Sequence, residues 1–177
     1  MNYTRPMSTA HEIAVHEAGH VVVAGYHKLL RIESVGFDPV HGGGVTTYPP
    51  GQPADPISLF YRMCMAAGGV VAMEIAGFEP AGADDDIRTL ALLAEAMKEA
   101  APEWSHPDPE TEARGILAQP WHWVQVVGIA RGILRHGVLR GEAIHKASAE
   151  LIHPDRVSEI AQVGLSEFAE RWLFSER

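Results

Sequence analysis

Apolar residues recur at helical spacing along most of the chain, which predicts a mainly helical protein. The first apolar stretch follows the tetrapeptide at 9–12, whose Thr9 and Glu12 have the spacing of a capping box. A helix is therefore expected to begin there and to run to about Leu30. A second helix is expected at 57–76, with Gly77 as its C-cap, and a third at 87–101. A proline-rich loop is expected at 102–110. Beyond this loop, helical segments are expected at 111–117, 121–135, 142–151 and 155–172.

One region has β-prone residues instead of helical periodicity. The runs RIESVGF at 31–37 and VTTYP at 45–49 flank a turn-rich segment with three successive glycines. Such runs predict a β-hairpin or a pair of short strands. The expected fold is therefore mainly α, with one small sheet beside the first helix, in a single domain of 177 residues.

Composition narrows the classes of function. The chain carries 23 acidic and 14 basic residues, a formal net charge of −9, so nucleic acid and membrane surfaces are not expected as partners. Its one cysteine, Cys64, lies among apolar residues and is expected to be buried and inert, which fits a reducing compartment. The sequence shows neither a signal peptide nor an uninterrupted apolar run of spanning length, so a cytoplasmic location is expected.

The candidate chemistry lies in the stretch AVHEAGHVVV at 14–23. Helical residues four apart share a face, so His16 and His20 can direct two imidazoles at one metal ion. Glu17, about 100° further round the helix, is placed to take a proton from a metal-activated water. The pattern HExxH in an apolar helix is typical of zinc hydrolases, which add a third protein ligand and keep one position open for water.

The residues alone leave the third ligand open. His27 shares the face of the histidine pair, but it lies about 10 Å along the helix from His20, too far to share one metal ion. Glu74, in an apolar helix, is a carboxylate that needs a partner when it is buried. The acidic run at 84–86 can bind metal, or it can simply stabilise a helix N-terminus; it consists of Asp84, Asp85 and Asp86.

The motif AVHEAGH, followed about 50 residues later by AAGGVVAMEIAGFEPAGADDDI, resembles the peptidase domain of the FtsH family of zinc proteases. That family combines HExxH with a downstream glycine pair, a helical glutamate and a GA-x-x-D loop whose last residue binds zinc. The resemblance implies one Zn²⁺ per chain held by His16, His20 and Asp86, with Glu17 as general base. It also implies a glycine pair at Gly68 and Gly69, the loop at Gly82 and Ala83, and supporting groups behind the ligands at Glu74 and Asp85, of which Asp85 is also the alternative ligand.

The resemblance covers residues 10–100, which lie in the expected zinc-site half of the domain at 1–100; residues 101–177 are the expected helical C-terminal half. It also implies that the β-prone runs form the family's small sheet, where an extended substrate is expected to pair with the edge strand at Val45, Thr46 and Thr47. FtsH proteins form rings, so a homo-oligomer is expected by analogy. They also carry an ATPase module and membrane anchors, but this sequence contains no G-x-x-x-x-G-K-[ST] motif.

The expected function is that of a zinc-dependent, ATP-independent endopeptidase acting on peptides or unfolded polypeptides. The alternative is a zinc-binding helical domain that has lost catalysis and serves in interaction or assembly, for which the aromatic residues Trp121 and Trp123 are candidate contacts. Glu17 argues against this alternative, because a domain without catalysis has no need to keep a base beside its ligands.

Overall fold

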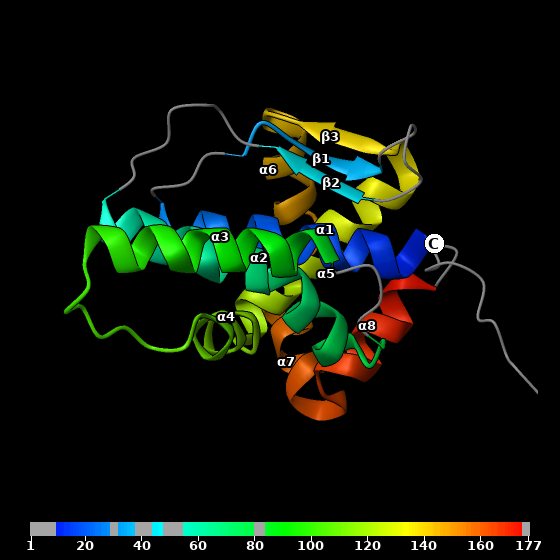
Figure 1. The fold of residues 1–177 in the computed structure, drawn as a ribbon. Helices are drawn as coiled ribbons and strands as arrows, with labels where there is room; N and C mark the ends of the chain where they lie inside the picture. The colour runs from blue at the N-terminus through cyan, green and yellow to red at the C-terminus, as the bar shows by residue number, and fades with distance from the viewer. Residues whose placement is uncertain (1–9, 29–31, 38–43, 48–54, 80–83, 175–177) are drawn as a thin grey trace, which may run out of the picture.

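A computed structural model of the chain describes residues 10–28, 32–37, 44–47, 55–79 and 84–174. The fold of these residues is mainly α with one small sheet, as the sequence predicts (Figure 1). The elements are α1 (Ala10–His27), β1 (Ser34–Phe37), β2 (Gly44–Thr47), α2 (Pro56–Ala76), α3 (Asp84–Ala100), α4 (Pro109–Leu117), α5 (Pro120–His136), β3 (Val138–Arg140), α6 (Glu142–Ala149), α7 (Pro154–Val163) and α8 (Leu165–Leu173).

Helices α1 and α2 pack closely against each other through glycines. A Cβ added at Gly19 of α1 would lie 2.3 Å from the carbonyl oxygen of Gly68 in α2, and one added at Gly68 would lie 2.9 Å from the carbonyl oxygen of Gly19. Val23 of α1 and Ala72 of α2 border this contact and are fully buried. No larger residue fits at either glycine unless the two helices move apart.

The sheet has the strand order β2-β1-β3, with both pairs antiparallel. The β1–β2 pair is the element that the sequence predicts, and it places Val35 opposite Thr46. Strand β3 is not predicted, because its three residues are too few to show an alternating pattern; its Leu139 lies opposite the same Val35. In Figure 1 the sheet lies on one side of α1, while α7 and α8 lie on the other side.

Besides strand β3, two helical regions of the C-terminal half differ clearly from the prediction. The single helix expected at 155–172 is divided into α7 and α8, because Gly164 between them has a φ of 86°, in the left-handed region that favours glycine. Helix α4 begins at Pro109, inside the region predicted to be a loop, because the Asp108 carboxylate caps it by accepting a hydrogen bond from the Thr111 amide.

Helices α1 and α2 were both predicted with defined ends. The cap expected at Thr9 lies outside the described residues. Helix α1 ends at His27 and is shorter than the predicted run to about Leu30, because the next residue, Lys28, has a φ of 58° and leaves the helical conformation. The start of α2 is capped by the Asp55 carboxylate, which accepts hydrogen bonds from two main-chain amides. Its end at Gly77, with φ of 82°, confirms the predicted C-cap.

Helix α2 lies in the core, as its apolar sequence predicts. No spanning segment is expected from the sequence, yet α2 is long and apolar enough to cross a membrane, by length and composition alone. In the structure 72% of its most apolar 18-residue stretch is buried, and core helices commonly have this composition.

Cys64 of α2 is fully buried. Burial, followed by the nearby charge of Glu112, raises the pKa of its thiol to about 12, so this residue is an inert part of the core, as predicted.

We expect Gly19→Ala to destabilise the protein by about 2 kcal/mol, because the new methyl group overlaps the carbonyl oxygen of Gly68. Gly25→Ala in the same helix is the matched control: a Cβ there meets nothing within 4 Å. The better helix propensity of alanine should raise its free energy of unfolding by up to about 1 kcal/mol. Urea unfolding measures both variants, and a Gly19→Ala protein as stable as the wild type would contradict the close packing of α1 and α2.

Candidate metal centre

Two histidines lie one turn apart on the face of α1 that meets α2. The Nε2 atoms of His16 and His20 are 3.1 Å apart. The His20 ring is buried, and its Nδ1 lies 2.7 Å from the main-chain carbonyl oxygen of Met65 in α2. Because a carbonyl oxygen only accepts, Nδ1 carries the hydrogen of the neutral ring, and Nε2 is the atom left to bind a metal ion.

Asp86 joins the two histidines from the first turn of α3. Its Oδ2 lies 2.9 Å from Nε2 of His16, and its Oδ1 lies 3.5 Å from Nε2 of His20. One potential ligand atom from each of the three side chains lies within 4.8 Å of the others. Two helices that are far apart in the sequence therefore bring their polar side chains to one point, which we call the His–His–Asp cluster.

The charges of the cluster are strongly coupled. Burial lowers the pKa of His20, but the adjacent carboxylate of Asp86 and the charge of Glu17 outweigh burial and raise this pKa to about 9. Burial likewise raises the pKa of Asp86, but its contacts with His16 and His20 outweigh burial and hold the pKa well below its usual range. The cluster thus favours a positive charge beside the Asp86 carboxylate, and a metal cation can replace the proton that otherwise supplies it.

Helix α2 leaves room for the two imidazoles because it has a glycine at position 69. A Cβ added at Gly69 would lie 2.6 Å from Cε1 of His16 and 2.7 Å from Cε1 of His20. The preceding Gly68 instead faces the backbone of α1. The two glycines of the pair therefore contribute differently. Gly68 allows α1 and α2 to pack closely, and Gly69 leaves space for the imidazole rings of His16 and His20.

The donor set fits a zinc ion. Zinc binds imidazole nitrogen and carboxylate oxygen at roughly 2.0–2.2 Å in tetrahedral sites, so neighbouring ligand atoms lie roughly 3.3 Å apart. Nε2 of His16 lies 3.1 Å from Nε2 of His20 and 2.9 Å from Oδ2 of Asp86, both close to that value. The other carboxylate oxygen of Asp86, Oδ1, lies 3.5 Å from Nε2 of His20. In addition, Oδ2 of Asp86 is buried without a properly oriented hydrogen bond among the described residues. A buried carboxylate oxygen beside two imidazoles, without a hydrogen bond of its own, is the arrangement expected of a metal ligand.

Glu17 lies beside the cluster and outside it. Its side chain is buried, with 5% of the residue exposed, and its Oε1 lies 4.0 Å from Nε2 of His16. Its Oε2 accepts a 2.6 Å hydrogen bond from Oγ1 of Thr46 in β2. The sequence predicted Thr46 only as a substrate-binding residue. It did not predict the contact between Thr46 and Glu17, because that contact depends on the strand register. The apolar Val35, which is buried opposite Thr46, is the residue from which the direction of the Thr46 side chain could have been inferred.

The structure does not bring Asp85 or Glu74 to the ligands that they were expected to support. The side chain of Asp85 is 93% exposed and pairs with Arg88 at 3.2 Å, because successive residues of α3 point about 100° apart. Glu74 is five residues beyond Gly69, about 140° round α2, and forms an ion pair with Arg114 of α4 at the surface. The expected loop residues Gly82 and Ala83 lie outside the described part of the chain.

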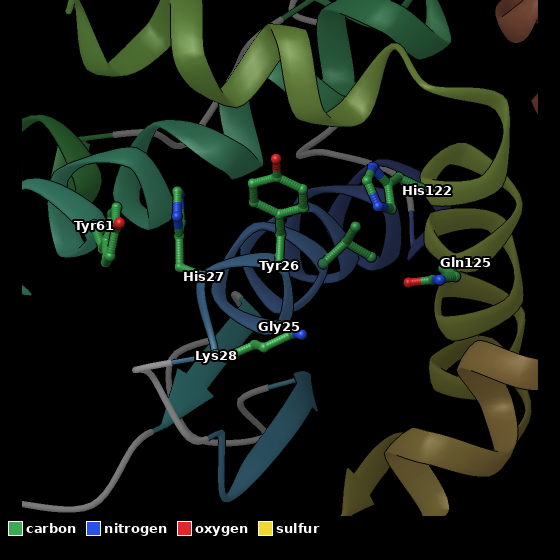
Figure 2. Close-up of a pocket in the computed structure, with 8 residues that line it drawn as sticks. Gly25, Tyr26, His27, Lys28, Tyr61, His122 and Gln125 are labelled. Atoms are coloured by element: carbon green, nitrogen blue, oxygen red, sulfur yellow. The ribbon is translucent and has the colours of Figure 1, made fainter.

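His27 lies at the end of α1, beside Tyr61 (Figure 2), and does not belong to the His–His–Asp cluster. Its ring stacks on Tyr61 of α2 with the centroids 3.9 Å apart, and burial lowers its pKa. Both rings line an open pocket that also includes Tyr26, His122 and Gln125. This position agrees with the exclusion of His27 from the ligand set by its distance along the helix.

Comparison with known proteins relates the chain to part of a zinc protease. The chain is 30% identical over 166 residues to the ATP-dependent zinc metalloprotease FtsH of Hahella chejuensis. The match covers 83% of this chain and 24% of that protein, so the chain corresponds to about a quarter of the relative's length. No model of a protein family matches the chain. The comparison therefore indicates an FtsH-related protease region.

We expect Asp86→Ala to lose bound zinc, because it removes the carboxylate that lies between the two histidines. Asp85→Ala, which removes the neighbouring exposed carboxylate, should keep one zinc per chain. Elemental analysis of the purified, dialysed proteins measures the metal content. Zinc retained by Asp86→Ala and lost by Asp85→Ala would reverse the assignment of the ligand.

We expect Gly69→Ala to weaken zinc binding by about 10- to 100-fold, since its methyl group displaces the His16 and His20 rings. Gly115→Ala in α4, where a Cβ meets nothing within 4 Å, should bind zinc as the wild type does. Competition with a chromogenic zinc chelator measures the affinities. An unchanged affinity in Gly69→Ala would show that the rings do not need this space to hold the metal.

Proposed function

We propose that the chain is a zinc-dependent endopeptidase that cleaves peptides or unfolded polypeptides without ATP. The proposal is carried by the position of Glu17, which faces the His–His–Asp cluster from the same helix with Oε1 4.0 Å from Nε2 of His16. A carboxylate beside a metal-binding cluster, yet outside the ligand set, has the place of the general base in HExxH hydrolases. The similarity to part of an FtsH protein supports the same class of reaction.

His16, His20 and Asp86 hold one ion per chain in this proposal. When bound, zinc supplies Lewis-acid chemistry that lowers the pKa of water to about 7 and polarises a carbonyl oxygen. Glu17 accepts one proton from the attacking water at Oε1 and delivers it to the amine nitrogen as the peptide C–N bond breaks. The water oxygen remains on the acyl carbon, and the second water proton leaves when the new carboxylic acid ionises, so the products are a carboxylate and an amine.

Strand β2 supports an extended substrate. It pairs with β1 along one edge, and no strand in the described part of the chain lies along its other edge. Main-chain groups of Val45, Thr46 and Thr47 can pair there with a peptide backbone, a binding mode that depends little on side-chain identity. Because this mode requires an extended chain and the 177 residues contain no P-loop, we propose peptides and unfolded polypeptides as substrates.

Location and assembly are further parts of the proposal. The single cysteine supports a cytoplasmic location, and the acidic net charge of −9 supports a protein whose partners are neither nucleic acid nor a membrane surface. A homo-oligomer is proposed only by analogy with FtsH rings.

We expect Glu17→Gln to lower the rate of casein cleavage by about 10²- to 10⁴-fold, because glutamine cannot accept the proton of the attacking water. Its zinc content should equal that of the wild type, since Glu17 is outside the ligand set. Fluorescent casein measures cleavage, and elemental analysis of the same preparation measures zinc.

A metal chelator should abolish wild-type cleavage, and added zinc should restore it. Wild-type protein that binds zinc and cleaves neither casein nor short peptides would contradict the proposal in favour of a non-catalytic zinc-binding domain. Equal cleavage by wild type and Glu17→Gln would contradict the role of Glu17.

A further inference from the structure

Thr46 of β2 forms a side-chain hydrogen bond with the Glu17 carboxylate. Its Oγ1 donates to Oε2 of Glu17 over 2.6 Å, a separation typical of a hydroxyl that donates to a carboxylate. Glu17 is almost fully buried, and Thr46 is partly buried. A buried carboxylate gains more from such a bond than an exposed one does, because water does not compete for it.

The register of the sheet explains why Thr46 meets α1. Thr46 lies directly opposite Val35 of β1, and residues directly opposite in an antiparallel pair share one face of the sheet. Val35 is fully buried and belongs to the main core, which also includes the α1 residues around Glu17. Thr46 therefore faces α1 from the edge strand, and a shift of one residue in the register would turn it away.

The two oxygens of Glu17 consequently have different surroundings. Oε2 is held by Thr46, while Oε1 is the oxygen that lies 4.0 Å from Nε2 of His16. A glutamate side chain has three rotatable bonds, and fixing them costs conformational entropy that a hydrogen bond at one oxygen can offset. With Oε2 held, Oε1 stays directed at the side of the cluster where a proton has to be taken up.

We propose that Thr46 is a positioning residue for the reaction: its hydroxyl holds the Glu17 carboxylate in the orientation in which Oε1 can accept a proton. This inference rests on the proposed peptidase function and gives β2 a second role besides substrate binding. The main chain of the strand pairs with the substrate, and the Thr46 side chain orients the base. The strand that binds the peptide is thus physically connected to the group that moves its proton.

The first test removes the hydroxyl while keeping the shape of the side chain. In a zinc-loaded protein, Thr46→Val should lower kcat for fluorescent casein by about 10- to 100-fold, with KM changed less than twofold and zinc content unchanged. Thr46→Ser restores the hydroxyl and should recover most of the lost rate. Thr111→Val is the matched control, because Oγ1 of Thr111 donates to the Asp108 carboxylate at an exposed helix start, and its kcat should equal that of the wild type.

The second test needs no activity. In metal-free protein, urea unfolding of Thr46→Val, Glu17→Ala and the double variant forms a double-mutant cycle. The Thr46 hydroxyl should contribute about tenfold to the unfolding equilibrium constant when Glu17 is present and little when Glu17 is absent. This coupling supports the contact whether or not the protein cleaves casein.

The outcomes separate the two proposals. Absence of coupling in the cycle overturns the contact, and with it the positioning role. Wild-type cleavage together with an unchanged kcat in Thr46→Val overturns the positioning role and leaves the peptidase function standing. A change confined to KM likewise overturns it, since a residue that only bound substrate would show that pattern. Failure of the wild type to cleave any substrate overturns the peptidase function itself, and positioning for that reaction falls with it.

Discussion

The candidate metal centre depends on the close approach of α1 and α2. At Gly19 and Gly68 the two backbones are so close that a single methyl group on either would overlap the other helix. The same approach brings the Met65 carbonyl within 2.7 Å of His20 and leaves only the space of Gly69 for the imidazoles. Helices separated by larger side chains would lie about 8–10 Å apart and would offer the His20 ring no such main-chain partner.

This packing places polar groups in an apolar seam, where each needs a partner. His20 has the Met65 carbonyl, and Glu17 has the Thr46 hydroxyl. The atoms that face one another across the centre are Nε2 of the two histidines and Oδ2 of Asp86, and Oδ2 is buried without a properly oriented hydrogen bond among the described residues. Because two imidazole nitrogens and a carboxylate oxygen converge at this point, the cluster has the composition and geometry of a binding site for a cation.

The sequence predicted those features that depend on local periodicity. The shared face of His16 and His20 and the sideways offset of Glu17 follow from the helix alone. Asp86 could not be chosen from three successive acids by spacing; the family resemblance pointed to it, and its inward direction depends on how α3 packs on α2. The Thr46 contact depends on strand register, and the division of the last helix depends on the backbone of Gly164. Glu74 was expected to support the ligands, but its rotation round α2 directs it to Arg114.

The residues beyond position 100, for which the sequence suggested no role in the site, nevertheless support its geometry. Strand β1 is the central strand, so it is fixed by β3 on one side as well as by β2 on the other. Leu139 of β3 is buried opposite Val35, the same residue that lies opposite Thr46. The orientation of Glu17 therefore depends on β2, the position of β2 depends on β1, and β1 is held from its other edge by a strand about 100 residues further along the chain. The C-terminal half thus contributes to the candidate site without supplying any of its ligands.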